Sequence, residues 1–211
     1  MPTDEDPADA LPGDFYMDTR AWCIYGPLTE DGWGTGNPLQ ADGVCDTRKV
    51  VFVTSQPYTG NLGGVDGADA ECATEAQNAG LTGTFKAWIS DSTHSPAQDF
   101  TQDGGPYLLP DLSTKVADDW ADLTDDSLDN PIDQQADGVN TEGFSVWTTT
   151  APNGTPTSTE TPHSCDDWTY PTDGGGQTAT IGLADSTDTD WTELASFRSC
   201  AEQHHLYCVQ Q

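Results

Sequence analysis

Residues 49–80 read KVVFVTSQPYTGNLGGVDGADAECATEAQNAG and carry the strongest structural signals of the chain. The first six residues are rich in β-branched side chains, and a segment of turn-forming residues, 55–60, comes directly after them. This combination predicts a strand over 49–54. The part that follows the turn has helical spacing and predicts a helix over about 67–79.

The predicted helix has an apolar stripe and a signal at each end. Ala68, Cys72 and Ala76 recur every four residues and therefore lie on one face of a helix. Asp66 is of a residue type that caps helix N-termini, and Gly80 suits the left-handed conformation that ends many helices. We therefore expect Cys72 to face the core from this helix.

Outward from this segment, the chain predicts more strands and little further helix. Ser95 followed by proline predicts the start of a short second helix. Residues 101–143 are dense in Asp, Gly and Pro and are expected to be mostly loop. Because strands and helices do not alternate, the predicted class is α+β. The other predicted strands are 85–90, 144–148, 178–183 and 205–210.

Composition restricts the kinds of partner that the chain can have. Among 211 residues there are six Lys plus Arg and 36 Asp plus Glu, so that the net charge is −30. Nucleic acids and anionic lipid surfaces would be repelled. No apolar run approaches the roughly 20 residues that cross a bilayer, so no membrane insertion is expected. We predict a disordered acidic leader over 1–14, an extension closed by a disulfide over 15–48, and one domain over 49–211.

Six cysteines without a CxxC pair favour three structural disulfides over a zinc site or a redox motif. Structural disulfides indicate an oxidising compartment, so the chain is predicted to be extracellular or at the cell surface, with its targeting or anchoring segment absent from this chain. Six cysteines allow 15 connectivities, and the residues by themselves do not select one. The cysteines are Cys23, Cys45, Cys72, Cys165, Cys200 and Cys208.

An ordered set of motifs gives the chain a family resemblance. These motifs are residues 52–72, 83–91, 130–132, 146–148, 165–168, 181–183 and 206–208. Together they resemble a bacterial extracellular domain family of unknown function, found in spirochaete surface proteins and in myxobacteria. That family is similar to the C-type lectin-like and endostatin-like fold, and the resemblance spans residues 50–211.

The resemblance implies a C-type lectin-like fold with two short helices, small antiparallel sheets, long loops and stabilising disulfides. It also implies two bridges, Cys72 with Cys208 and Cys165 with Cys200, which leaves Cys23 to pair with Cys45. A bridge from Cys72 to Cys208 would close a loop of more than a hundred residues and stabilise the fold by up to roughly 4 to 5 kcal/mol.

The sugar-binding members of that superfamily bind Ca²⁺ through two short triplets. The positions that correspond here are 151–153, which read APN, and 191–193, which read WTE. Most of the carboxylates of the family pattern are missing from these triplets. The resemblance implies Asn153 and Trp191 as ligand-binding residues, and the alternative is that Trp191 is a core aromatic and Asn153 a turn residue.

Two Asp-rich loops are further candidates for Ca²⁺, the cofactor that we expect. Calcium takes about six to eight oxygen ligands, and carboxylates on a short loop supply them. Neither loop has the spacing of an EF-hand. In so acidic a chain, such clusters also arise by composition, and the alternative is a solvated anionic surface. The candidate ligands are Asp185, Asp188, Asp190 and Glu193 in one loop and Asp129, Asp133 and Asp137 in the other.

No catalytic motif is present. The chain lacks G-x-S-x-G, H-E-x-x-H and a P-loop, and His204 and His205 would point to opposite faces of a strand. We therefore expect a secreted or surface-anchored, non-catalytic binding or adhesion module that recognises a glycan or an extracellular protein through its long loops. The alternative is a structural subunit or decorating domain of an extracellular assembly, such as a filament, a sheath or an envelope layer, built by self-assembly.

Overall fold

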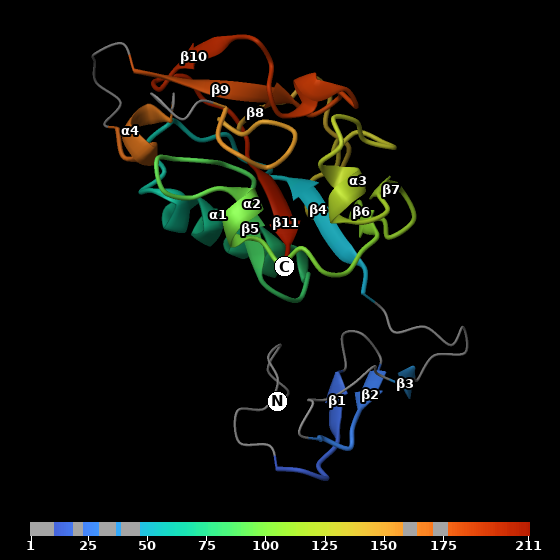
Figure 1. Ribbon diagram of the computed structural model, residues 1–211. Coiled ribbons are helices and arrows are strands. Elements are labelled where there is room, and N and C mark those ends of the chain that lie inside the picture. Colours follow the sequence, from blue (N-terminus) through green and yellow to red (C-terminus); the bar gives the residue numbers. More distant parts are fainter. Residues whose placement is uncertain (1–10, 19–22, 30–36, 39–46, 158–163, 171–176) are drawn as a thin grey trace. The chain divides into compact units, whose positions relative to one another are not determined.

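The computed structural model describes residues 11–18, 23–29, 37–38, 47–157, 164–170 and 177–211 (Figure 1). The chain divides into two units, Met1–Arg48 and Lys49–Gln211. Cys23 is fully buried in the first unit. Its predicted partner Cys45 lies outside the described residues, as do the first ten residues of the predicted leader.

The first unit contains a small antiparallel sheet. Its strands are β1 (Tyr16–Asp18), β2 (Cys23–Tyr25) and β3 (Asn37–Pro38), in the order β1-β2-β3. Met17 lies opposite Ile24 in the register of β1 and β2. Among the described residues of this unit, the large apolar side chains of Leu11, Phe15 and Met17 are exposed.

The second unit is built around a five-stranded sheet with the order β5-β11-β4-β6-β7 (Figure 1). The strand β11 pairs antiparallel with both β4 and β5, whereas β4 and β6 are parallel. The central strand β4 is buried along its whole length, which explains its unbroken run of apolar residues. The bounds are β4 (Lys49–Val53), β5 (Phe85–Ala87), β6 (Tyr107–Leu108), β7 (Lys115–Ala117) and β11 (Tyr207–Gln210).

A second sheet in this unit has three antiparallel strands in the order β10-β9-β8. They are β8 (Ser145–Trp147), β9 (Thr178–Leu183) and β10 (Phe197–Ser199). The bounds of β9 coincide with the prediction, while β8, β5 and β11 are shorter than predicted. The stretch 101–143, expected to be mostly loop, also contains β6, β7 and one helical turn, α3 (Trp120–Leu123).

The longest helix, α1 (Val65–Ala79), packs against β5 and β11. It begins two residues before the predicted start, and Gly64 occupies the N-cap position that was predicted for Asp66. Gly80 ends the helix with φ 77° and ψ 14°, as its position predicted. The shorter helices are α2 (Pro96–Asp99), α4 (Cys165–Trp168) and the 3₁₀ turn η1 (Thr189–Trp191). The class of the fold is thus α+β with few helices and small sheets.

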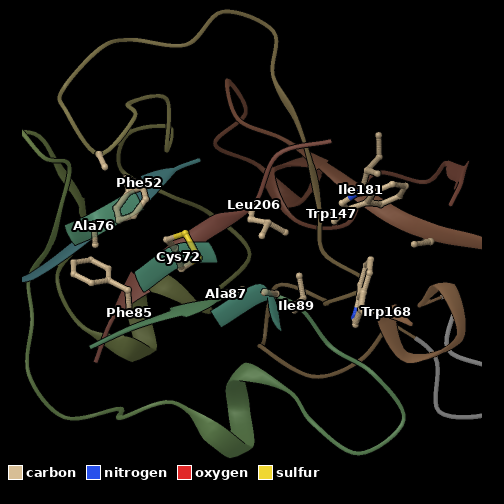
Figure 2. Packing of buried hydrophobic residues seen from close by; sticks show 14 of the residues in the cluster. Phe52, Cys72, Ala76, Phe85, Ala87, Ile89, Trp147, Trp168, Ile181 and Leu206 are labelled. Atoms are coloured by element: carbon tan, nitrogen blue, oxygen red, sulfur yellow. A yellow bond between two sulfur atoms is a disulfide. The ribbon is translucent and has the colours of Figure 1, made fainter. Parts of the chain in front are cut away.

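The apolar stripe of α1 is buried in the core, as predicted. Ala68, Cys72 and Ala76 belong to one cluster with aromatic residues of the sheet and of the loops. Figure 2 shows Phe52 and Phe85 near the disulfide of Cys72, and Trp147 near Ile181. A second cluster contains the buried rings of Trp88, Tyr107, Trp191 and Tyr207.

Two disulfides cross-link the second unit. Cys72 bridges to Cys208 across 136 residues and so ties α1 to the last strand. Cys165 bridges to Cys200 across 35 residues and ties α4 to the end of β10. These are the two pairings that the resemblance implied.

The short segment α4 is a left-handed turn. Its four residues, Cys165–Trp168, have φ values of 53°, 55°, 51° and 60°. Such a conformation costs roughly 1 to 2 kcal/mol per residue, so surrounding contacts must hold it. The carbonyl of Trp168 accepts hydrogen bonds from the N–H groups of Leu62, Gly63 and Gly64, at 2.8, 3.0 and 3.1 Å. The turn is therefore fixed against the segment that leads into α1.

Candidate functional site

The described surface of the second unit has a groove of about 370 Å³ beside α1. Residues of three segments line it: 55–58, which follows β4; the α1 face from Glu71 to Ala79; and 135–137. The groove therefore depends on parts of the chain that are far apart in sequence. Its main polar residues are Tyr58, Glu71, Glu75, Asn78, Gln135 and Asp137.

One wall of the groove comes from α1. Glu71, Glu75 and Asn78 have the spacing i, i+4 and i+7, which places them on one helix face beside the buried stripe. Glu75 Oε1 accepts hydrogen bonds from the Ser55 hydroxyl at 2.8 Å and from the Ser55 N–H at 3.2 Å. Glu71 Oε2 accepts one from the Tyr58 hydroxyl at 3.2 Å. Among the described residues, no hydrogen bond reaches the second carboxylate oxygen of either glutamate.

The aromatic member of the groove is Tyr58. Burial raises the pKa of Tyr58 well above its ordinary value, and the nearby carboxylates of Glu71 and Glu75 raise it further. The phenol therefore stays protonated and donates its hydrogen bond at any physiological pH. The Tyr58 carbonyl also accepts a hydrogen bond from the Trp147 indole N–H at 2.8 Å, which fixes the backbone behind the ring.

The opposite wall is a tight turn over residues 135–139. The N–H of Gln135 donates to the carbonyl of Val139 at 2.8 Å, and Asp137 Oδ1 accepts from the N–H of Val139 at 3.1 Å. The N–H of Val53 donates to the carbonyl of Gln134 at 2.8 Å, so the turn is attached to the end of β4. Both walls therefore rest on regular structure, which is the condition for a site of fixed shape.

The groove offers acceptors, amides and one aromatic ring. The residues that line it include three carboxylates and three side-chain amides, but no Lys, Arg or His. A ligand with several hydrogen-bond donors would satisfy this set, because the free carboxylate oxygens are acceptors only.

A second, smaller pocket of about 240 Å³ lies between the start of α1 and α2. Burial raises the pKa of Asp69 in this pocket to about 6, although the Ala87 N–H donates to its carboxylate at 2.8 Å. The ammonium of Lys86, which also lines the pocket, donates to the carbonyl of Asp99 at 2.8 Å. A cationic side chain, Lys86, thus lines this pocket, whereas the groove is lined by none, so the groove is the more suitable site for a ligand that donates hydrogen bonds.

In the first predicted calcium loop, 185–193, Asp188 makes hydrogen bonds within the loop itself. Asp188 Oδ1 accepts hydrogen bonds from the Ser186 hydroxyl at 2.7 Å and from the Asp190 N–H at 3.1 Å, and so caps η1. Asp185 is exposed, and burial raises the pKa of Glu193. In the second predicted loop, Asp129 pairs with the Lys115 ammonium at 2.8 Å, and Asp137 closes the turn of the groove.

The predicted ligands do not gather into a cation site. Burial, together with the charges of Asp111 and Asp185, raises the pKa of Asp133, so carboxylates of both predicted loops lie near enough to interact. Within the described parts of the chain, however, no three His, Cys, Asp or Glu side chains form a group that could hold a metal ion. The expectation of calcium therefore stays a prediction without a site of convergent ligands.

The two residues implied as ligand contacts have structural positions. Trp191 is only 1% exposed and packs between Trp88 and Tyr207, with ring centroids 5.0 and 5.6 Å away. This corrects its assignment, because a ring enclosed by core aromatics cannot contact a ligand at the surface. Asn153 is exposed, but its Oδ1 accepts hydrogen bonds from Thr155, at 3.1 Å from the N–H and 2.7 Å from the hydroxyl, as in a turn.

No protein-family model and no curated protein matches the chain. Among the described residues, no helix is long and apolar enough to cross a membrane. The two disulfides fit an oxidising, extracellular environment. Of the groove residues, only Asp137 was a predicted site residue, as a calcium ligand. The spacing of Glu71, Glu75 and Asn78 on α1 is a signal that could have indicated the helix side of the groove.

Proposed function

We propose that the chain is a secreted or surface-anchored, non-catalytic binding module that takes a glycan in the groove beside α1. The observation that carries this proposal is the lining of the groove: one tyrosine ring, three amides and three carboxylates within about 370 Å³. The proposal thus differs from the sequence-based expectation, in which the long loops recognise the ligand.

The lining suits a sugar in both its polar and its apolar parts. A sugar ring carries several hydroxyl groups around its edge and a C–H face that packs on an aromatic ring. Carboxylates and amides accept from and donate to hydroxyls, and Tyr58 offers the aromatic surface. The volume lies near the lower end of the range of small-molecule sites, roughly 300 to 1,000 Å³.

Two amide variants test this proposal. We expect Asn78→Ala and Gln135→Ala each to weaken glycan binding by about tenfold, because each removes a hydrogen-bonding side chain from the groove. The measurement is a glycan array with the full chain, followed by calorimetric titration of the best ligand. Asn153→Ala is the control, since it removes an exposed amide outside the groove lining. An array without ligands, or a loss confined to Asn153→Ala, would contradict the proposal.

Self-assembly is a second candidate function, favoured by the first unit. Leu11, Phe15 and Met17 are 67%, 64% and 49% exposed, and β1 is an edge strand of its sheet. Exposed apolar side chains beside an unpaired strand edge are typical of association surfaces. If the chain assembles, its elution volume on size-exclusion chromatography should decrease with protein concentration, and Phe15→Ser should reverse this change. A monomer at every concentration would rule assembly out.

A further inference from the structure

Two adjacent histidines connect the groove to the second sheet. His204 pairs with Tyr58 through two backbone hydrogen bonds, of 2.7 Å from the Tyr58 N–H and 2.9 Å from the His204 N–H. On the other side, the His205 N–H donates to the Ser145 carbonyl, and the Trp147 N–H donates to the His205 carbonyl, both at 2.9 Å. The two histidines thus hold the groove segment 55–58 against β8.

The ring of His204 is enclosed. Its side chain is 7% exposed, its Nδ1 lies 2.5 Å from the Ser145 hydroxyl, and its centroid lies 4.3 Å from that of Trp147. Its Nε2 is buried and has no hydrogen-bond partner among the described residues. The nearest carboxylate oxygen, on Glu202, is 3.7 Å away, which is too far for a hydrogen bond.

The ring of His205 is also fixed by its neighbours. It stacks on Phe144 with a centroid distance of 3.9 Å and an angle of 13° between the planes. Its Nδ1–H donates to the carbonyl of Thr54 at 2.8 Å, immediately before the groove segment. Both imidazoles therefore occupy positions between β8 and the strand end that leads into the groove.

The charged groups around His204 and His205 act on the protonation of the two rings in opposite directions. Glu202 faces His204 and favours its protonation, whereas Arg198 and the neighbouring His205 disfavour it. Glu75 of the groove wall faces His205. Burial is the largest influence at both residues and lowers the pKa of both imidazoles below the ordinary value. In an opened state the rings would be hydrated and the cost of burying their charge would be removed, so the opened state binds protons more readily.

We propose that His204 and His205 form an acid-sensitive latch whose protonation releases segment 55–58 from β8 and opens one wall of the groove. In the closed state, a proton on His204 adds a buried charge beside Trp147, and the Glu202 carboxylate, 3.7 Å from Nε2, offsets the cost of burial only in part. The neutral latch is stable above the ordinary histidine pKa of about 6.5 and weakens as the pH falls below it. The inference rests on the proposed function only in taking the groove as the binding site.

The test uses the full chain without a ligand. NMR spectra between pH 7.5 and 5 would follow the imidazole C–H signals and the hydrogen exchange of the Tyr58 and His204 N–H groups. If closing lowers the pKa of an imidazole by one unit, full protonation of that imidazole raises the equilibrium constant for opening about tenfold. We expect protection of both amides, corrected for intrinsic exchange, to fall by at least about tenfold, while amides between β4 and β11 keep theirs.

Variants separate the latch from other titrations. His204→Phe with His205→Phe keeps two aromatic rings and should remove the pH dependence, whereas His94→Gln, at an exposed histidine, should leave it unchanged. The latch would be overturned if both imidazoles stayed neutral down to pH 5. It would also be overturned if both were protonated while the Tyr58 N–H stayed protected from hydrogen exchange. An equal loss of protection in β4 and β11 would also overturn it, because the event would then be global unfolding. These outcomes hold whether or not a glycan binds.

Discussion

Replacing Cys72 and Cys208 together by alanine is expected to lower the free energy of unfolding by about 5 kcal/mol. The bridge closes 136 residues, and in the chain-entropy model the stabilisation grows with the length of the closed loop. A domain of ordinary stability has about 5 to 15 kcal/mol in total, so this loss is about a third or more of the free energy of unfolding. Urea unfolding under non-reducing conditions, followed by tryptophan fluorescence, measures this loss.

The matched control is the other bridge. Replacing Cys165 and Cys200 by alanine removes a bridge that closes a loop of only 35 residues. It should lower the free energy of unfolding by about 4 kcal/mol, roughly 1 kcal/mol less than the loss of the longer bridge. A loss of less than about 2 kcal/mol for the Cys72 and Cys208 pair, or a larger loss for the shorter bridge, would contradict the entropic account.

Trp168→Ala is expected to lower the free energy of unfolding by about 3 to 5 kcal/mol. The side chain is fully buried, and its indole N–H donates to the Ser90 carbonyl at 2.9 Å. It also anchors a left-handed turn, so its removal leaves a cavity beside an already costly backbone. Thermal and urea unfolding would both report the change.

Trp168→Phe keeps an aromatic ring and removes the indole donor. We expect it to cost about 1 to 3 kcal/mol, because the Ser90 carbonyl loses its partner and a smaller ring leaves space. If the alanine and phenylalanine variants were equally stable, packing of the Trp168 ring would not hold the turn in place.

The elements that the sequence predicts best depend on local signals. The strand β9 and the end of α1 at Gly80 follow from β-branched residues and from glycine chemistry. The strands β6 and β7 were missed because β6 owes its existence to parallel pairing with β4, from far away in the chain. The left-handed turn at Cys165–Trp168 depends on contacts with 62–64 and carries no local signal.

The candidate site was harder to predict than the fold. The groove requires α1, 55–58 and 135–137 to meet, and only the helix side has a periodic pattern in sequence. Trp191 belongs to the core because Trp88 and Tyr207 enclose it, a contact between three distant segments. The alternation of side chains along a strand predicts that His204 and His205 point to opposite faces. It gives no information on the burial of their rings, which depends on β8 and Glu202.

The bridge between α1 and β11 has a mechanical consequence. The strands β4 and β11 are antiparallel neighbours, so a pull on Lys49 and Gln211 would peel them apart from one end. The covalent link from Cys72 to Cys208 stops this peeling almost at once on the β11 side. Only residues 49–71 and 209–211 can extend, a reach of roughly 90 Å. The 135 residues inside the ring lie outside the covalent path of the load, but extension of 49–58 would remove the hydrogen bonds that attach Gln134 to Val53 and His204 to Tyr58.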